Sequence, residues 1–92
     1  LSDEALLSLS AFHRDEQAYE ELVKRYENEI FRFVKRMGVP RLDAEDLFQD
    51  VWLKIWNKKN YQDNSQANCR AYLYKSTRNA IADYWKSRNI YA

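Results

Sequence analysis

Two short stretches of this 92-residue chain hold side chains whose types and spacing could do chemistry. The first is acidic, because residues 43–50 carry four carboxylates and no cation. The second is basic, because residues 70–88 carry five Lys or Arg side chains and the single acid Asp83. Aromatic side chains lie among these cations. The formal net charge of the whole chain is only +1. This separation of charge predicts two surfaces for two different partners.

The acidic stretch allows three interpretations. Asp46, Gln49 and Asp50 lie three and four residues apart, so on a helix they share one exposed face. That face is either an ordinary solvated surface beside capping acids or a docking patch for a basic partner. Paired carboxylates could also act as general acid and base, but no histidine, nucleophile or glycine-rich anion cradle accompanies them. We therefore expect no catalytic residue and no enzyme.

The basic stretch indicates either nucleic-acid binding or a solvated helix surface. Cations neutralise phosphates, aromatic rings stack on unpaired bases, and an asparagine amide both donates to and accepts from a base edge. The candidates for these contacts are Tyr72, Lys75, Arg78, Asn79 and Lys86. In the alternative interpretation, the tyrosines belong to the core and the lysines only solvate the surface.

Residues 58–68 separate the two stretches and are mostly polar, which predicts a loop. With 11 residues, the loop is longer than most connections between helices. It is either a plain connector or a pocket in which amide side chains hold an extruded base. In the second case Lys58 and Lys59 would hold phosphates, and Tyr61 is the aromatic residue of the loop.

The composition excludes several classes of protein. One Gly and one Pro favour long helices over a β-sandwich. A single Cys and a single His are too few for a disulfide framework, a typical metal site or a catalytic triad, and we expect no cofactor. We assign Cys69 to packing and His13 to a surface junction. Without a long apolar run or a signal-peptide pattern, the expected location is cytoplasmic; the start at Leu1 predicts a fragment.

Four helices are predicted to position these side chains. The first begins after the capping residue Ser2 and is interrupted at Arg14. The second is capped by Asp15, carries apolar residues at helical spacing from residue 19 to 37, and stops at Gly38. Asp43 is expected to cap the third helix, and the fourth runs from about residue 68 to 88. The fold class is therefore all-α, a compact four-helix domain with a long loop before the last helix.

A central, an upstream and a downstream part of the chain resemble region 2 of the extracytoplasmic-function sigma factors of the sigma-70 family, in the order of the family pattern. Residues 44–56, AEDLFQDVWLKIW, are similar to the run A-E-D-L-x-Q-[ED]-x-[FW]-x-x-[ILV]-[WY]. Residues 15–26 resemble D-x-x-A-[FY]-x-x-L-x-x-x-Y. Residues 71–74 and 78–84 resemble W-L-[YF] and [AR]-N-x-x-x-D-x. The similarity covers nearly the whole chain.

The resemblance implies that residues 1–92 form one region 2 domain, which docks on core RNA polymerase and binds promoter DNA. Asp46, Gln49 and Asp50 would contact the clamp helices of the largest polymerase subunit. The last helix and the loop before it would bind and melt the −10 element through its non-template strand. The resemblance also implies an anti-sigma factor as a partner, and a region 4 domain that is absent from these residues.

Three residues depart from the family pattern. Arg14 stands where the family usually has Gly, and Tyr72 replaces a Trp. Lys86 replaces an Arg, which keeps the charge but loses the bidentate phosphate geometry. The sequence also leaves two other classes open. A four-helix protein adaptor would need no cations beside aromatic residues on its last helix, and a helix-turn-helix regulator would need a short turn and short helices.

Overall fold

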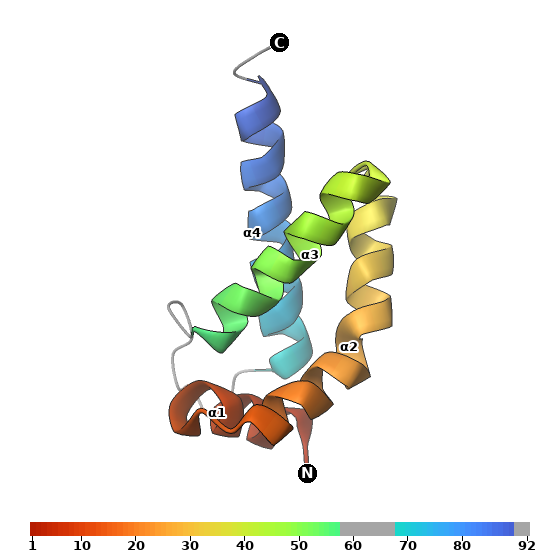
Figure 1. The fold of residues 1–92 in the computed structure, drawn as a ribbon. Coiled ribbons are helices and arrows are strands. Elements are labelled where there is room, and N and C mark those ends of the chain that lie inside the picture. The colour runs from red at the N-terminus through yellow and green to blue at the C-terminus, as the bar shows by residue number, and fades with distance from the viewer. Residues whose placement is uncertain (58–67, 90–92) are drawn as a thin grey trace.

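The computed structural model describes residues 1–57 and 68–89, and this part of the chain contains four α-helices and no strand. The helices are α1 (Asp3–His13), α2 (Glu16–Arg36), α3 (Arg41–Trp56) and α4 (Cys69–Asn89). Figure 1 shows α1 at the foot of the molecule, beside the starts of α2 and α4, while α3 crosses α4 at an angle. The prediction of an all-α, four-helix domain is confirmed.

Side-chain caps begin three of the helices where the sequence suggests them. Ser2, Asp15 and Asn68 each accept a hydrogen bond from the backbone amide three residues later, at 3.1 Å in every case. Such caps satisfy amides that have no partner inside a helix. These local hydrogen bonds therefore fix the starts of α1, α2 and α4.

The third helix begins earlier than predicted. Pro40 occupies the N-cap position with φ −57° and ψ 148°, and α3 starts at Arg41, so the prediction that Asp43 caps this helix is wrong. The pyrrolidine ring of a proline fixes φ at about −65°, and no side-chain hydrogen bond caps the helix. Asp43 lies in the first turn instead, where its carboxylate accepts hydrogen bonds from Tyr84 at 2.6 Å and from Arg88.

Both short connections between helices use left-handed backbone. Arg14, between α1 and α2, has φ 53°, and Gly38, between α2 and α3, has φ 86°. Glycine adopts this region without a steric penalty, whereas arginine does not. Contacts of the Arg14 guanidinium compensate, because it donates to the Trp56 carbonyl at 2.6 Å and lies 4.1 Å from the centre of the Trp56 ring. These contacts explain how Arg stands at a position where the resemblance leads one to expect Gly.

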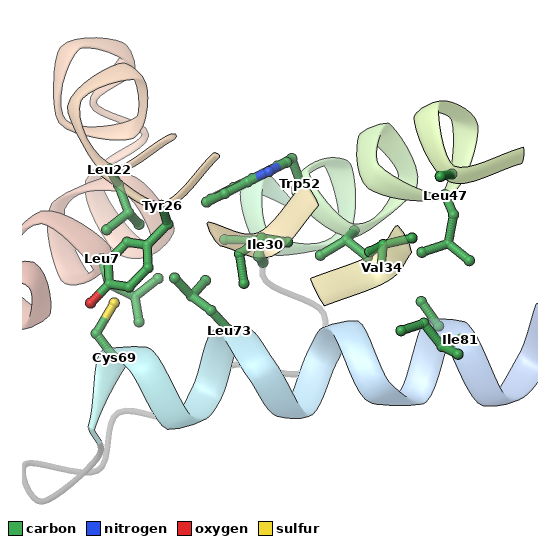
Figure 2. Packing of buried hydrophobic residues seen from close by; sticks show 14 of the residues in the cluster. Leu7, Leu22, Tyr26, Ile30, Val34, Leu47, Trp52, Cys69, Leu73 and Ile81 are labelled. Atoms are coloured by element: carbon green, nitrogen blue, oxygen red, sulfur yellow. The ribbon is translucent and has the colours of Figure 1, made fainter. Parts of the chain in front are cut away.

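One apolar core joins all four helices (Figure 2). Leu22, Ile30 and Val34 of α2 are each at most 1% exposed, and they meet Trp52 of α3 and Leu73 of α4. Burial of one such side chain contributes roughly 1.5–3 kcal/mol. The core therefore holds α3 and α4 in place and leaves their charged faces outside.

Within the described ranges, no helix combines the length and the hydropathy needed to cross a membrane.

Candidate functional site

The outer face of α4 forms the first candidate surface. Four of the residues predicted to bind nucleic acid line one depression of about 570 Å³: Tyr72, Lys75, Asn79 and Lys86. Lys54 of α3 adds a further cation to the depression, and Asp83 adds one acid. Tyr72 is half-buried against the core, whereas the other three predicted side chains are exposed. The fold thus brings a ring, an amide and three cations onto one surface.

Arg78 is exposed but does not line this depression. It lies three residues after Lys75, so it stands at the edge of the same outer surface. Within residues 1–57 and 68–89, the ion pairs involve neither Lys75, Arg78 nor Lys86. These three charges are therefore the ones that α4 can offer to a partner.

The other two cations of α4 form ion pairs on the surface of the domain with acids of α2 and α3. Arg70 pairs with Glu29 of α2, and Arg88 pairs with Asp43 of α3. The charge of Glu29 is the main cause that raises the pKa of Arg70 above its ordinary value. The basic surface available to a partner is therefore smaller than the charge count of the sequence suggests.

Two tyrosines of α4 are also used inside the fold. Tyr74 packs against Phe33 with ring centres 5.0 Å apart and donates a hydrogen bond to Glu29 at 2.9 Å. Tyr84 donates to Asp43 at 2.6 Å. Burial raises the pKa of Tyr74, and the hydrogen bond to Asp43 raises the pKa of Tyr84, so both hydroxyls stay protonated at neutral pH. The two hydroxyls are therefore engaged by acids of α2 and α3.

The acidic candidates are all exposed on α3, but they border two different grooves. Asp46 and Asp50 line a groove of about 360 Å³ between α3 and α4. Gln49 lines a more apolar groove of about 510 Å³ between α2 and α3. Their shared helix face is therefore a ridge between two hollows, which is a suitable shape for contact with another protein.

Two leucines on the same ridge were missed by sequence reasoning. Leu42 and Leu53 are 79% and 54% exposed. Leu42 precedes Asp46 by four residues, and Leu53 follows Gln49 by four, so helical spacing puts them on one stripe. That spacing was the signal available in the sequence. The face thus combines negative charge with apolar surface at both ends.

The remaining candidates are three residues of the predicted loop and the single cysteine. Lys58, Lys59 and Tyr61, predicted to contact DNA, lie outside the described residues. Among the described residues, no three His, Cys, Asp or Glu side chains are grouped so that they could hold a metal ion. Cys69 is fully buried, and burial is the main cause that raises its pKa to about 12. A protonated buried thiol is unreactive, in agreement with a packing role.

Comparison with known proteins gives consistent results. The Sigma-70 region 2 family matches residues 22–90. The ECF RNA polymerase sigma factor RpoE of Cereibacter sphaeroides is 30% identical over 79 residues, which are 86% of this chain and 44% of that protein. RNA polymerase sigma factor NccH of Alcaligenes xylosoxydans xylosoxydans is 27% identical over 88 residues, 96% of this chain and 46% of that protein. RNA polymerase sigma factor CnrH of Cupriavidus metallidurans is 24% identical over 85 residues, 92% of this chain and 44% of that protein.

The chain spans less than half the length of these relatives. No solved structure matches it. The family match nevertheless includes all of α3 and α4, which carry both candidate surfaces. Members of the family are transcription initiation factors and not enzymes, which agrees with the prediction that the chain is not an enzyme. The chain belongs to the sigma-70 region 2 family and is the region 2 domain of an extracytoplasmic-function RNA polymerase sigma factor.

Proposed function

We propose that this domain docks on core RNA polymerase through α3 and binds the promoter −10 element through α4. The observation that carries the proposal is the division of charge between the two helices. The carboxylates of Asp46 and Asp50 stand on an exposed ridge of α3, while Lys75, Arg78 and Lys86 stand on the outer surface of α4. Opposite charges on separate helices allow one small domain to bind a basic protein surface and an anionic strand together.

The protein partner would be the clamp helices of the largest polymerase subunit. Asp46, Gln49 and Asp50 would meet cationic and amide side chains of those helices. Leu42 and Leu53 would be covered by apolar side chains, and burial would contribute about 25 cal/mol for each Å² of apolar surface removed from water. In this arrangement the exposed carboxylates mainly steer and orient the encounter, and the leucines supply contact energy.

The DNA partner would be the non-template single strand, lying along the depression on α4. Lys75, Arg78 and Lys86 would neutralise phosphates, and the amide of Asn79 would contact a base edge. The exposed part of the Tyr72 ring would stack on one base, and each base–aromatic stack is worth roughly 1–3 kcal/mol. Phosphate contacts and the Tyr72 stack would supply affinity, while Asn79 would supply sequence preference.

Melting of the −10 element would use the segment that precedes α4. A base would leave the stack and enter a pocket formed by residues 58–68, where Lys58 and Lys59 would hold phosphates and Tyr61 would offer a ring. Extracting a base costs a few kcal/mol, which pocket contacts and phosphate neutralisation would offset. The position of Tyr72 and Lys75 within the first two turns after this segment supports the assignment.

The wider setting follows from the family. Residues 1–92 would act as one region 2 domain in the bacterial cytoplasm, and an anti-sigma factor would hold the full-length protein inactive. Recognition of the −35 element would belong to a region 4 domain outside these residues.

Docking through α3 is tested by Asp46→Arg. Because Asp46 is exposed and its carboxylate takes part in none of the hydrogen bonds or ion pairs among the described residues, the variant should fold normally. We expect it to lose affinity for core RNA polymerase, measured by fluorescence anisotropy of the labelled domain, and to keep its affinity for single strands. Unchanged polymerase affinity would refute the assignment of this face.

Base reading by Asn79 is tested by Asn79→Ala. We expect the variant to weaken binding to a strand selected from a random pool more than binding to a scrambled strand. The matched control is Asn28→Ala, which removes the same amide from an exposed position of α2 and should change neither affinity. Equal losses on both strands would show that Asn79 carries no sequence information.

A further inference from the structure

We infer that Glu4 of α1 is a positioning residue for DNA binding, because it caps the strand-binding helix α4 from a different part of the chain. The Glu4 carboxylate accepts a hydrogen bond from the Cys69 amide at 2.8 Å, across 65 residues of sequence. Cys69 is the first residue of α4. Figure 1 shows why this contact is possible, since α1 lies beside the start of α4. The inference rests on the proposed binding of DNA by α4.

The Glu4 carboxylate satisfies a backbone amide at the start of α4 that has no partner within the helix. The first amides of a helix have no partner inside it, and the positive end of the helix dipole favours a nearby carboxylate. The side chain of Asn68 accepts a hydrogen bond from the Ala71 amide at 3.1 Å, and Glu4 accepts one from the Cys69 amide. Because Cys69 is fully buried, water replaces a lost carboxylate poorly.

A polar network holds the acidic end of α1 in place. Asp3, next to Glu4, accepts hydrogen bonds from Tyr26 and from Arg25 of α2, the latter at 2.7 Å. Arg25 also donates to the Leu1 carbonyl at 2.9 Å. The segment that carries Glu4 is therefore fixed against α2, so its carboxylate sets a definite position for the first turn of α4.

Further contacts tie the next turns of α4 to α2. Arg70 pairs with Glu29 and lies 5.2 Å from the centre of the Tyr26 ring, and Tyr74 donates to the same Glu29. Tyr26 and Glu29 thus connect α1, α2 and the start of α4. This arrangement orders the backbone on which the binding surface begins.

Loss of the Glu4 cap should displace binding residues near the start of α4 more than those near its end. Tyr72 and Lys75 lie within the first two turns, so fraying of the start displaces both of them. Lys86 lies near the other end of the helix and keeps its place. Loss of the Glu4 cap should therefore weaken contacts near the start of α4 while the fold and the α3 face remain. A uniformly destabilised domain would instead lose both binding activities.

The test compares three variants of the full chain. Glu4→Ala removes the acceptor, Glu4→Gln keeps an acceptor oxygen at the same reach, and Glu16→Ala removes an exposed acid from the first turn of α2. The probes are a short fluorescent single strand selected from a random pool, a scrambled strand, and core RNA polymerase. Hydrogen exchange reports the amides in the first turn of α4. Glu4→Asp, whose carboxylate falls one methylene short, replaces Glu4→Ala if that variant does not fold.

We expect Glu4→Ala to speed exchange in the first turn of α4 and to weaken binding of the selected strand by up to about fivefold, the factor that corresponds to the stabilisation of a helix start by a typical cap. Glu4→Gln should restore most of the affinity, Glu16→Ala should match the wild type, and polymerase affinity should not change in any variant. Unchanged strand affinity in Glu4→Ala, or an equal loss of polymerase affinity, would overturn the inference. A wild-type domain that binds no strand at all would instead overturn the proposed function.

Discussion

The salt dependence of strand binding should depend on which cations of α4 are free to meet phosphates. Lys75, Arg78 and Lys86 take part in no ion pair among the described residues, whereas Arg70 and Arg88 are paired with Glu29 and Asp43. The perturbation is the triple variant Lys75→Gln, Arg78→Gln and Lys86→Gln. Its comparison is the double variant Arg70→Gln and Arg88→Gln.

The magnitude follows from counterion release. Each phosphate contact on a single strand contributes about 0.7 to the slope of log affinity against log salt concentration. If each of the three unpaired cations meets one phosphate, the triple variant should lower that slope by about 2. These three contacts should make the wild-type affinity fall by roughly 20-fold between about 50 and 200 mM salt. The triple variant, which lacks the contacts, should not show this fall.

The assay is fluorescence anisotropy of a labelled single strand, titrated at several salt concentrations. The double variant should change the slope little, because the two arginines already pair with acids of the chain. The Tyr74–Glu29 hydrogen bond and the Glu4 cap still hold the start of α4 in that variant. The double variant should lower the free energy of unfolding by about 1 kcal/mol or less for each exposed pair. A triple variant with the wild-type slope, or a double variant that flattens the slope equally, would refute the division between free and paired cations.

Three further outcomes are expected. Leu73→Ala should lower the free energy of unfolding by about 2–5 kcal/mol in urea denaturation, because Leu73 is fully buried in the core. Arg14→Ala should lower the melting temperature more than Arg14→Gly, because alanine keeps the left-handed strain while both lose the Trp56 contacts. The hydrogen bond from Tyr26 is the main cause that lowers the pKa of Asp3 below 3.8, so ionised Asp3 stabilises the fold above that pH, and this stabilisation is lost as pH falls through the lowered pKa. Asp3→Asn should therefore be less stable by about 1–2 kcal/mol at neutral pH, and urea denaturation in acid should show that difference shrinking.

The helices could be predicted because their signals are local. Ser2 and Asp15 cap the amides three residues later, and Gly38 stops α2 by adopting a left-handed backbone. The apolar positions of α2 repeat at helical spacing, so its buried face follows from the sequence alone. The exposure of Asp46 on α3 followed from the same periodicity.

The roles of several charged side chains could not be predicted, because their partners are distant in the sequence. Asp43 looked like a cap by its place before an apolar run, but its carboxylate accepts a hydrogen bond from Tyr84, which is 41 residues away. Arg70 is one of the five cations counted in the basic stretch, but Glu29, also 41 residues away, pairs with it. Only the packing of α4 against α2 and α3 decides which charges are used internally and which remain for a partner.

The most direct test of the central claim is a crossed binding measurement with two variants and two partners. Asp46→Arg and the triple variant of Lys75, Arg78 and Lys86 are each titrated against core RNA polymerase and against a selected single strand. We expect Asp46→Arg to lose the polymerase and keep the strand, and the triple variant to lose the strand and keep the polymerase. If both variants lose both partners, or if neither variant loses any, the two faces do not divide the function between them.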